Sequence, residues 1–141
     1  MNYETLWEKA LIVTKEAILN SSLTPLETKS KLIKNHLNEY FELRQLKSTK
    51  LLNKIFNGPK PNPFYPWDSD LEISSIFDSH ELILNKYPVQ LGHMLLITNT
   101  WKPQIGWLEK EDFKALISVN SDTSGLWFFN SGPKAGASQP H

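Results

Sequence analysis

Cysteine is absent from the 141-residue chain, and its absence excludes disulfide frameworks, thiolate zinc sites and cysteine nucleophiles. No charge of one sign is in excess, because 15 basic and 15 acidic residues give a formal net charge of zero. The overall charge therefore gives no indication of nucleic acid or an acidic membrane surface as a partner. No apolar run approaches the roughly 20 residues that span a bilayer. Glu4 and Glu8 stand where a signal peptide carries basic residues, so we expect a soluble, cytoplasmic protein.

The two halves of the chain differ in composition, since eight of the nine prolines and four of the five tryptophans follow residue 58. In residues 3–19 the apolar side chains recur with helical spacing. Thr24, Pro25 and Glu27 then have the pattern of an N-cap, a first helical residue and a capping box. These features predict a helix over 3–19, a second helix from Pro25 to about Phe41, and a helical segment over residues 1–55.

The second half predicts a sheet. Residues 56–70 contain proline and glycine that forbid regular structure, yet also Phe64, Tyr65 and Trp67, which we expect to pack on the core or a ligand. Four apolar runs predict strands, at residues 71–77, 81–87, 93–99 and 125–130. Residues 107–119 have helical spacing. The order predicts an α+β fold, an antiparallel sheet with flanking helices, with the sheet domain over residues 56–141.

The last stretch, "FFNSGPKAGASQPH" at 128–141, has the composition of an anion-binding loop. Gly132 and Gly136 can adopt positive φ and let backbone N–H groups approach a ligand. Asn130 and Lys134 add an uncharged donor and a cation. The stretch matches neither G-x-x-x-x-G-K-[ST] nor G-x-G-x-x-G. From the residues alone, a plain surface turn therefore stays open as the alternative to a phosphate loop.

Three blocks in order carry a resemblance to a known family: "NPFYPWDSDL" (62–71), "HELILNKYPVQLGHMLLITN" (80–99) and "NSGPKAGASQPH" (130–141). They resemble segments of the diadenosine tetraphosphate phosphorylases, also called ATP adenylyltransferases, which belong to the histidine-triad group. In that family the last block runs on into His-x-His-x-Gln, and this chain ends on the first histidine of that motif, His141. The resemblance implies a histidine-triad-like sheet that is incomplete at the C-terminus.

The resemblance also implies an activity. The family cleaves a dinucleoside polyphosphate with inorganic phosphate to give ATP and ADP, by way of a nucleotidyl-histidine intermediate. His141 would be a catalytic residue that orients and polarises the nucleophile, while the nucleophilic histidine would lie outside this chain. A second chain carrying the C-terminal half is one way to supply it. A catalytically silent nucleotide-binding or interaction module is the alternative. We predict no metal site, because His93 and His141 alone are weak evidence for zinc. No cofactor is certain, and assistance by a divalent cation is left open.

Nucleotide binding is assigned by the resemblance to an adenine pocket, a ribose contact and a phosphate cradle. The assigned residues are Lys60, Asn62, Pro63, Phe64, Asn85, Lys86, Asn130, Ser131, Gly132, Gly136, Ala137, Ser138 and Gln139. Asn85 takes the ribose position, and an asparagine in an apolar strand independently needs partners if it is buried. We expect His93 to be structural, and His36 and His80 to lie at the surface.

Overall fold

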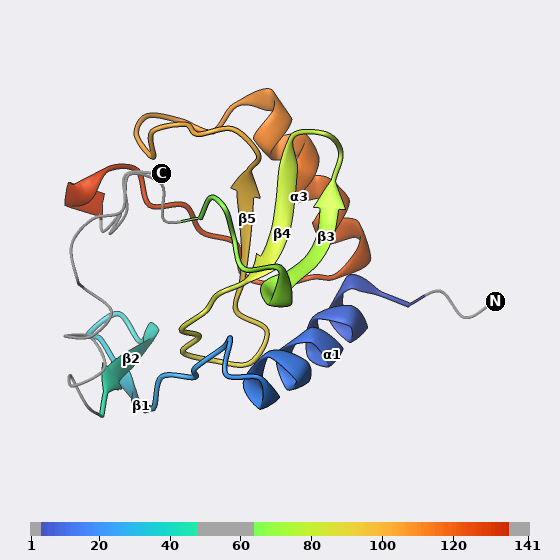
Figure 1. Cartoon of the computed structure of the whole chain (residues 1–141). Helices are drawn as coiled ribbons and strands as arrows, with labels where there is room; N and C mark the ends of the chain where they lie inside the picture. The colour runs from blue at the N-terminus through green and yellow to red at the C-terminus, as the bar shows by residue number, and fades with distance from the viewer. Residues whose placement is uncertain (1–3, 48–63, 136–141) are drawn as a thin grey trace.

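In the computed structural model, which describes residues 4–47 and 64–135, a three-stranded antiparallel sheet is flanked by two helices (Figure 1). The strands β3 (Glu72–Ile76), β4 (His80–Leu84) and β5 (Met94–Thr98) lie in that order across the sheet. The helices are α1 (Leu6–Leu19) and α3 (Lys110–Asp122). The predicted α+β fold with an antiparallel sheet is confirmed, as are the three strands and both of these helices. No helix in the described ranges is long and apolar enough to cross a membrane.

The core lies between one face of the sheet and the two helices. Thr5 is the N-cap of helix α1: its hydroxyl accepts the Glu8 N–H while the Glu8 carboxylate accepts the Thr5 N–H, which is a capping box. Ala10 on α1 and Ala115 on α3 are fully buried. Because alanine is small, both helices can approach the sheet closely, where Leu82 is also fully buried. The helices thus fix one face of the sheet and leave the other face for different contacts.

The register of β4 and β5 decides which side chains share a face. Leu82 lies opposite Leu96, and Leu84 lies opposite Met94. Side chains alternate across a strand, so these residues face the helices together with His80. One step further along, the Asn85 N–H donates to the His93 carbonyl over 2.9 Å, which pairs these two residues. Asn85 and His93 consequently lie on the face opposite the helical core.

The prediction of a helix from Pro25 to about Phe41 is wrong. Residues 1–55 are consequently not helical throughout, as the prediction of a helical segment required. Two antiparallel strands, β1 (Thr28–Lys34) and β2 (Tyr40–Leu46), form a hairpin there. At its turn Asn38 has φ of 64°, a conformation that asparagine tolerates. The Asn35 side-chain oxygen accepts the N–H groups of Leu37 and Glu39, each over 2.9 Å. This side-chain to backbone bonding stabilises a turn where a helix was expected.

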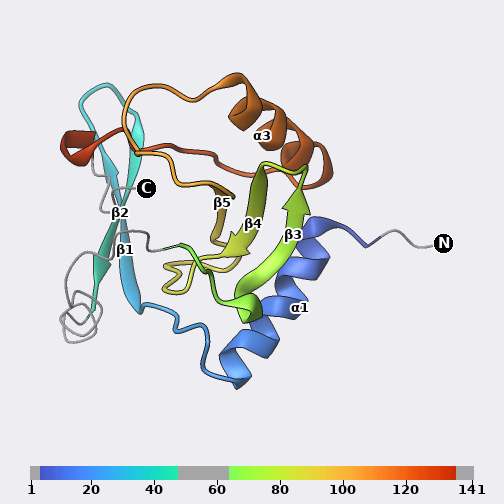
Figure 2. The ribbon, with the colours of Figure 1, turned by 45° about the horizontal axis from the view of Figure 1, so that its top comes forward.

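The hairpin stands beside the three-stranded sheet and does not join it (Figure 2). It is attached to the connection between β4 and β5, since the Leu26 N–H donates to the Pro88 carbonyl over 2.8 Å. Arg44 Nη1 also donates to the Val89 carbonyl, over 3.2 Å. The predicted boundary between residues 55 and 56 lies outside the described residues and stays a prediction.

The predicted strand over residues 125–130 is also wrong, because the structure has an irregular segment there. Side chains hold this segment in place of a strand ladder. Trp127 Nε1 donates to Asn120 Oδ1 over 3.0 Å, and the Trp127 ring packs against the core. Phe128 lies beside His93, with 6.4 Å between ring centroids. The segment therefore reaches the sheet face that carries Asn85 and His93.

Candidate functional site

The structure describes some of the predicted nucleotide-binding residues and not others. It describes Phe64, Asn85, Lys86, Asn130, Ser131 and Gly132. Lys60, Asn62, Pro63, Gly136, Ala137, Ser138, Gln139 and His141 lie outside the described residues, and their roles stay predictions. The described part of the candidate site therefore comprises the sheet face around Asn85, residues 128–135, and the residues that these two regions contact.

Asn85 is half-buried at the end of β4 and makes the internal contacts that its position demands. Its Oδ1 accepts the Tyr87 N–H over 2.9 Å, which fixes the orientation of the amide. Its Nδ2 consequently points toward His93 Nε2, at 3.3 Å. One amide proton and one oxygen lone pair of Asn85 stay available for a ligand. This remaining capacity suits the pair of hydroxyls on a ribose ring.

The same contact fixes the tautomer of His93. Since Asn85 Nδ2 can only donate, His93 Nε2 must accept, and the proton of the neutral imidazole is on Nδ1. Burial lowers the pKa of His93 below its ordinary value, which favours this neutral form. Among residues 4–47 and 64–135, His93 Nδ1 is buried without a hydrogen-bond partner. The expectation that His93 has a structural role is consistent with its contacts to Asn85 and Phe128.

The described part of the predicted phosphate loop is anchored on a second loop, residues 99–109, that joins β5 to α3. The Gly132 N–H donates to the Gln104 carbonyl over 2.7 Å. The Ser131 hydroxyl donates to the Gly106 carbonyl, also over 2.7 Å. Gly132 has φ of 75°, the left-handed conformation for which glycine is suited. With these two protons engaged, anion contacts from this loop would come from the Asn130 side chain and from Lys134, which is exposed.

The remaining described residues of the predicted set lie nearer the start of β3. Lys86 Nζ is 3.4 Å from Asp68 Oδ2, so its charge is partly compensated. Phe64 is half-buried at the start of the aromatic segment. In that segment the rings of Tyr65 and Trp67 meet edge to face at 5.7 Å. Trp67 Nε1 donates to Glu72 Oε2 over 3.1 Å, which links the segment to the start of β3. Tyr65 is 60% exposed, so packing of these aromatic residues on the core or on a ligand stays a prediction.

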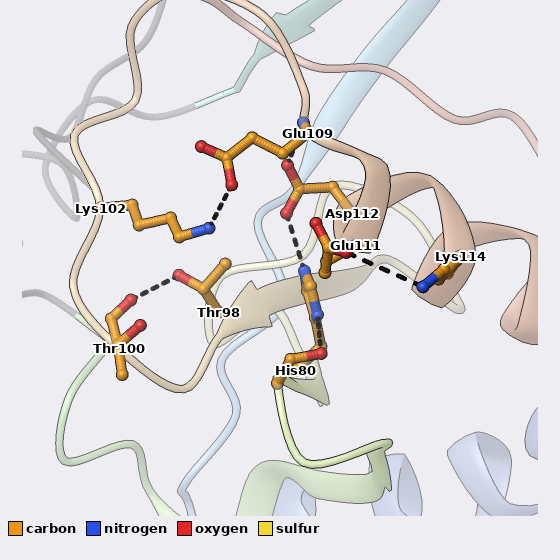
Figure 3. A network of polar contacts seen from close by, with 9 residues as sticks. His80, Thr98, Thr100, Lys102, Glu109, Glu111, Asp112 and Lys114 are labelled. Carbon is orange, nitrogen blue, oxygen red and sulfur yellow. Dashed lines mark hydrogen bonds and ion pairs between the residues drawn. The ribbon is translucent and has the colours of Figure 1, made fainter.

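His80 is buried, with 3% of its surface exposed, and the expectation of a surface position is wrong. Its Nε2 lies 3.0 Å from Asp112 Oδ1, and its Nδ1 lies 2.9 Å from Ser79 Oγ (Figure 3). The sequence contained the signal, because His80 alternates with Leu82 and Leu84 and so shares their core face. His36, by contrast, is exposed as expected.

A cavity of about 220 Å³ lies between α1 and the connection from β4 to β5. Its walls are mainly apolar and include Ile18, Leu23, Leu84, Val89 and His93. Ligand pockets for small molecules usually enclose about 300–1,000 Å³. The cavity is therefore smaller than a usual ligand pocket. Within the described ranges, no group of three or more metal-ligating side chains is present.

Comparisons with known proteins agree on one family. The model of the family described as "Ap4A phosphorylase N-terminal domain" matches residues 1–141. "Diadenosine 5',5'''-P1,P4-tetraphosphate phosphorylase 2" of Saccharomyces cerevisiae is 31% identical over 103 residues, which cover 63% of this chain and 32% of that protein. "Protein APA1" of the same yeast is 37% identical over 70 residues, which cover 45% of this chain and 22% of that protein.

Solved structures give the same result for the fold. The crystal structure of yeast Ap4A phosphorylase Apa2 in complex with Ap4A matches with a TM-score of 0.80 at 26% identity, over 100% of this chain and 50% of its own. The structure of Apa2 in complex with AMP matches with a TM-score of 0.78 at 26% identity, over 100% of this chain and 49% of its own. The chain thus spans half or less of the length of each of these relatives.

Proposed function

Because the chain belongs to the family of the Ap4A phosphorylase N-terminal domain, we propose that it supplies the nucleotide-binding part of an enzyme that cleaves diadenosine tetraphosphate with inorganic phosphate, giving ATP and ADP. The observation that carries this proposal is the match of the whole chain, at a TM-score of 0.80, to a phosphorylase crystallised with Ap4A. The sheet face with Asn85 and His93, bordered by residues 128–135, supports it because it offers a ribose contact beside a glycine-containing loop.

Binding begins with the nucleoside next to the reacting phosphate. The ribose hydroxyls use the remaining donor and acceptor of Asn85, while His93 holds the other amide proton and keeps the side chain in place. The adenine packs against the predicted pocket of Asn62, Pro63 and Phe64. These groups contact the nucleoside and carry no charge. The loop at 130–139 therefore has to bind the negatively charged polyphosphate.

The chemistry then needs a nucleophile and fixed donors. A histidine nitrogen attacks the α-phosphorus in line, the bond from that phosphorus to the bridging oxygen breaks, and ATP leaves. Inorganic phosphate attacks the resulting adenylyl-histidine, releases the histidine and forms ADP. Lys134 and the Asn130 amide meet the charge on the phosphoryl oxygens, which is greatest in the transition state. His141 orients the nucleophile, which comes from the x-His-x-Gln continuation of the motif, either on the same polypeptide or on a second chain.

Calorimetric titration with Ap4A tests the assignment of the loop. Lys134→Ala removes a cation that we place next to the phosphates, so the affinity should fall by about 5- to 10-fold, and the difference should shrink in high salt. Lys114→Ala is the matched control, because Lys114 is an exposed lysine on α3 whose Nζ lies 3.8 Å from Glu111 Oε1. Equal affinities of the two variants at low salt would contradict the placement of Lys134.

A further inference from the structure

The loop of residues 99–109 presents a tryptophan to solvent. Trp107 is 96% exposed, although tryptophan is among the side chains that gain most from burial. Ile105, two residues earlier, is 63% exposed. Exposed apolar side chains gathered on one loop mark a surface that contacts something else.

The loop is held in place at both ends (Figure 3). At its start the Thr98 hydroxyl donates to the Thr100 carbonyl over 2.8 Å. At its end Lys102 Nζ lies 2.7 Å from Glu109 Oε2, and the Glu109 N–H donates to Asp112 Oδ2 over 2.6 Å. Asp112 in turn contacts the buried His80. An aromatic side chain carried by a loop that is already ordered loses less entropy when it binds a ligand.

The loop also contacts the predicted phosphate loop directly. Ser131 Oγ donates to the carbonyl of Gly106, the residue before Trp107. The Gly132 N–H donates to the Gln104 carbonyl. Gly106 has φ of 82°, so the backbone turns at the point of contact. These bonds fix the backbone next to Trp107 beside the 130–135 segment. On the other side, Phe128, which precedes that segment, lies beside the His93 ring.

This arrangement places the predicted phosphate loop between two surfaces that different parts of residues 128–132 contact. One is the sheet face at Asn85 and His93, which the proposed function gives to the adenosine next to the reacting phosphate. A dinucleoside tetraphosphate has a second adenosine at the other end of its phosphate chain. Phosphates that cross the 130–135 segment lead toward the 99–109 loop. The exposed indole that this loop carries offers a flat surface on which a purine can stack, which contributes about 1–3 kcal/mol per base.

Resting on the proposed function, we propose that Trp107 stacks on the second adenine of the dinucleoside polyphosphate and so makes the 99–109 loop the element that distinguishes dinucleotides from mononucleotides. The first nucleoside does not reach this loop. Loss of the indole should therefore affect the dinucleotide and spare AMP.

The test is a calorimetric titration of the whole protein with Ap4A and, separately, with AMP. Trp107→Ala should weaken Ap4A binding roughly 5- to 150-fold, which is the stacking contribution converted to affinity, and should change AMP binding less than twofold. Trp107→Phe should restore most of the affinity because it keeps an aromatic face. Leu19→Ala is the control, since Leu19 is 78% exposed at the end of α1 and should change neither affinity.

The outcomes separate the two proposals. If the wild type binds both nucleotides and Trp107→Ala leaves Ap4A binding unchanged, or weakens AMP as much as Ap4A, the stacking role is wrong while the proposed function stands. If the wild type binds neither nucleotide, the proposed function fails and the stacking role fails with it. Circular dichroism melting of each variant checks folding, and an exposed Trp107 should alter the melting temperature by little.

Discussion

Replacing Asp112 by alanine should destabilise the protein because its carboxylate makes two contacts that link the sheet to α3. Oδ1 lies 3.0 Å from His80 Nε2, and Oδ2 accepts the Glu109 N–H at the start of the helix. A carboxylate only accepts hydrogen bonds, so His80 Nε2 carries a proton that it donates to Asp112. The side chain of Asp112 is 16% exposed and that of His80 is 4% exposed. Water can therefore replace little of what is lost.

The magnitude follows from the two contacts. A buried donor left without its partner, here His80 Nε2, costs about 1–3 kcal/mol. Loss of the side-chain bond at the helix N-terminus costs about 1 kcal/mol. Asp112→Ala should thus lower the free energy of unfolding by about 2–4 kcal/mol. Asp112→Asn keeps the size and one acceptor and should cost less. Glu111→Ala, one residue earlier and exposed, should change it by less than about 0.5 kcal/mol.

Urea denaturation at pH 7, followed by circular dichroism, measures these differences. A double-mutant cycle with His80→Ala isolates the coupling between the two side chains, which we expect to be about 1–2 kcal/mol. If Asp112→Ala and Glu111→Ala destabilise equally, or if the coupling is zero within error, the buried pair does not stabilise the protein. The same pair holds the end of the 99–109 loop, so amide hydrogen exchange in that loop should become faster in Asp112→Ala.

Three further predictions concern stability. Gly92→Ala should lower the free energy of unfolding by about 2–4 kcal/mol, because Gly92 has φ of 73° and an added Cβ would lie 2.1 Å from Trp7 Cζ3. Thermal melts measure this change. Gly125→Ala is the control and should be neutral, since its Cβ meets no described atom within 4 Å. Burial lowers the pKa of His93, so the unfolded chain takes up a proton at a higher pH than the folded protein does. The stability that is present above pH 6.5 should therefore be lost as the pH falls through the folded-state pKa. His93→Gln should make the free energy of unfolding depend less on pH in this range. Burial raises the pKa of Glu81, so stability should fall as the pH rises through its folded-state pKa, and Glu81→Gln should be more stable than the wild type at pH 7.

Local periodicity predicted the elements that form the core. The apolar run in "ELILNKY" predicted a strand, and the structure buries Leu82 and Leu84 of that strand in the core. The helix at residues 110–122 followed from its apolar spacing. The helix was predictable because it buries one face, which the spacing of its apolar residues indicates. The strand was predictable from a continuous apolar run, because all five residues of β4 are buried.

The hairpin at residues 28–46 was missed because its signals compete. A helix start is indicated by Thr24, Pro25 and Glu27. The turn depends instead on the side chain of Asn35, which accepts backbone N–H groups, and on the positive φ of Asn38, and only the structure shows these two features. Residues 125–130 were predicted to form a strand from their apolar run, yet single side-chain contacts hold the segment, between Trp127 and Asn120 and between Phe128 and His93. Sequence spacing carries little information about such contacts.

The candidate site was predictable in part for the same reason. Asn85 stood out as an asparagine in an apolar strand, and it is half-buried with partners. Its pairing with His93, which fixes the imidazole tautomer, depends on the register between β4 and β5. The contact of Ser131 and Gly132 with the 99–109 loop joins segments about 25 residues apart, as the Ser131 to Gly106 bond shows. Neither pairing could be read from the chain before the sheet was formed.

The most direct test of the proposed function is product analysis of Ap4A cleavage by the protein that carries this chain. The reaction is run with and without inorganic phosphate, and the nucleotides are separated by chromatography. Phosphorolysis predicts ATP and ADP in equal amounts, with no cleavage when phosphate is left out. ATP and AMP formed without phosphate would indicate hydrolysis instead, and Ap4A left intact in both reactions would contradict the proposed activity.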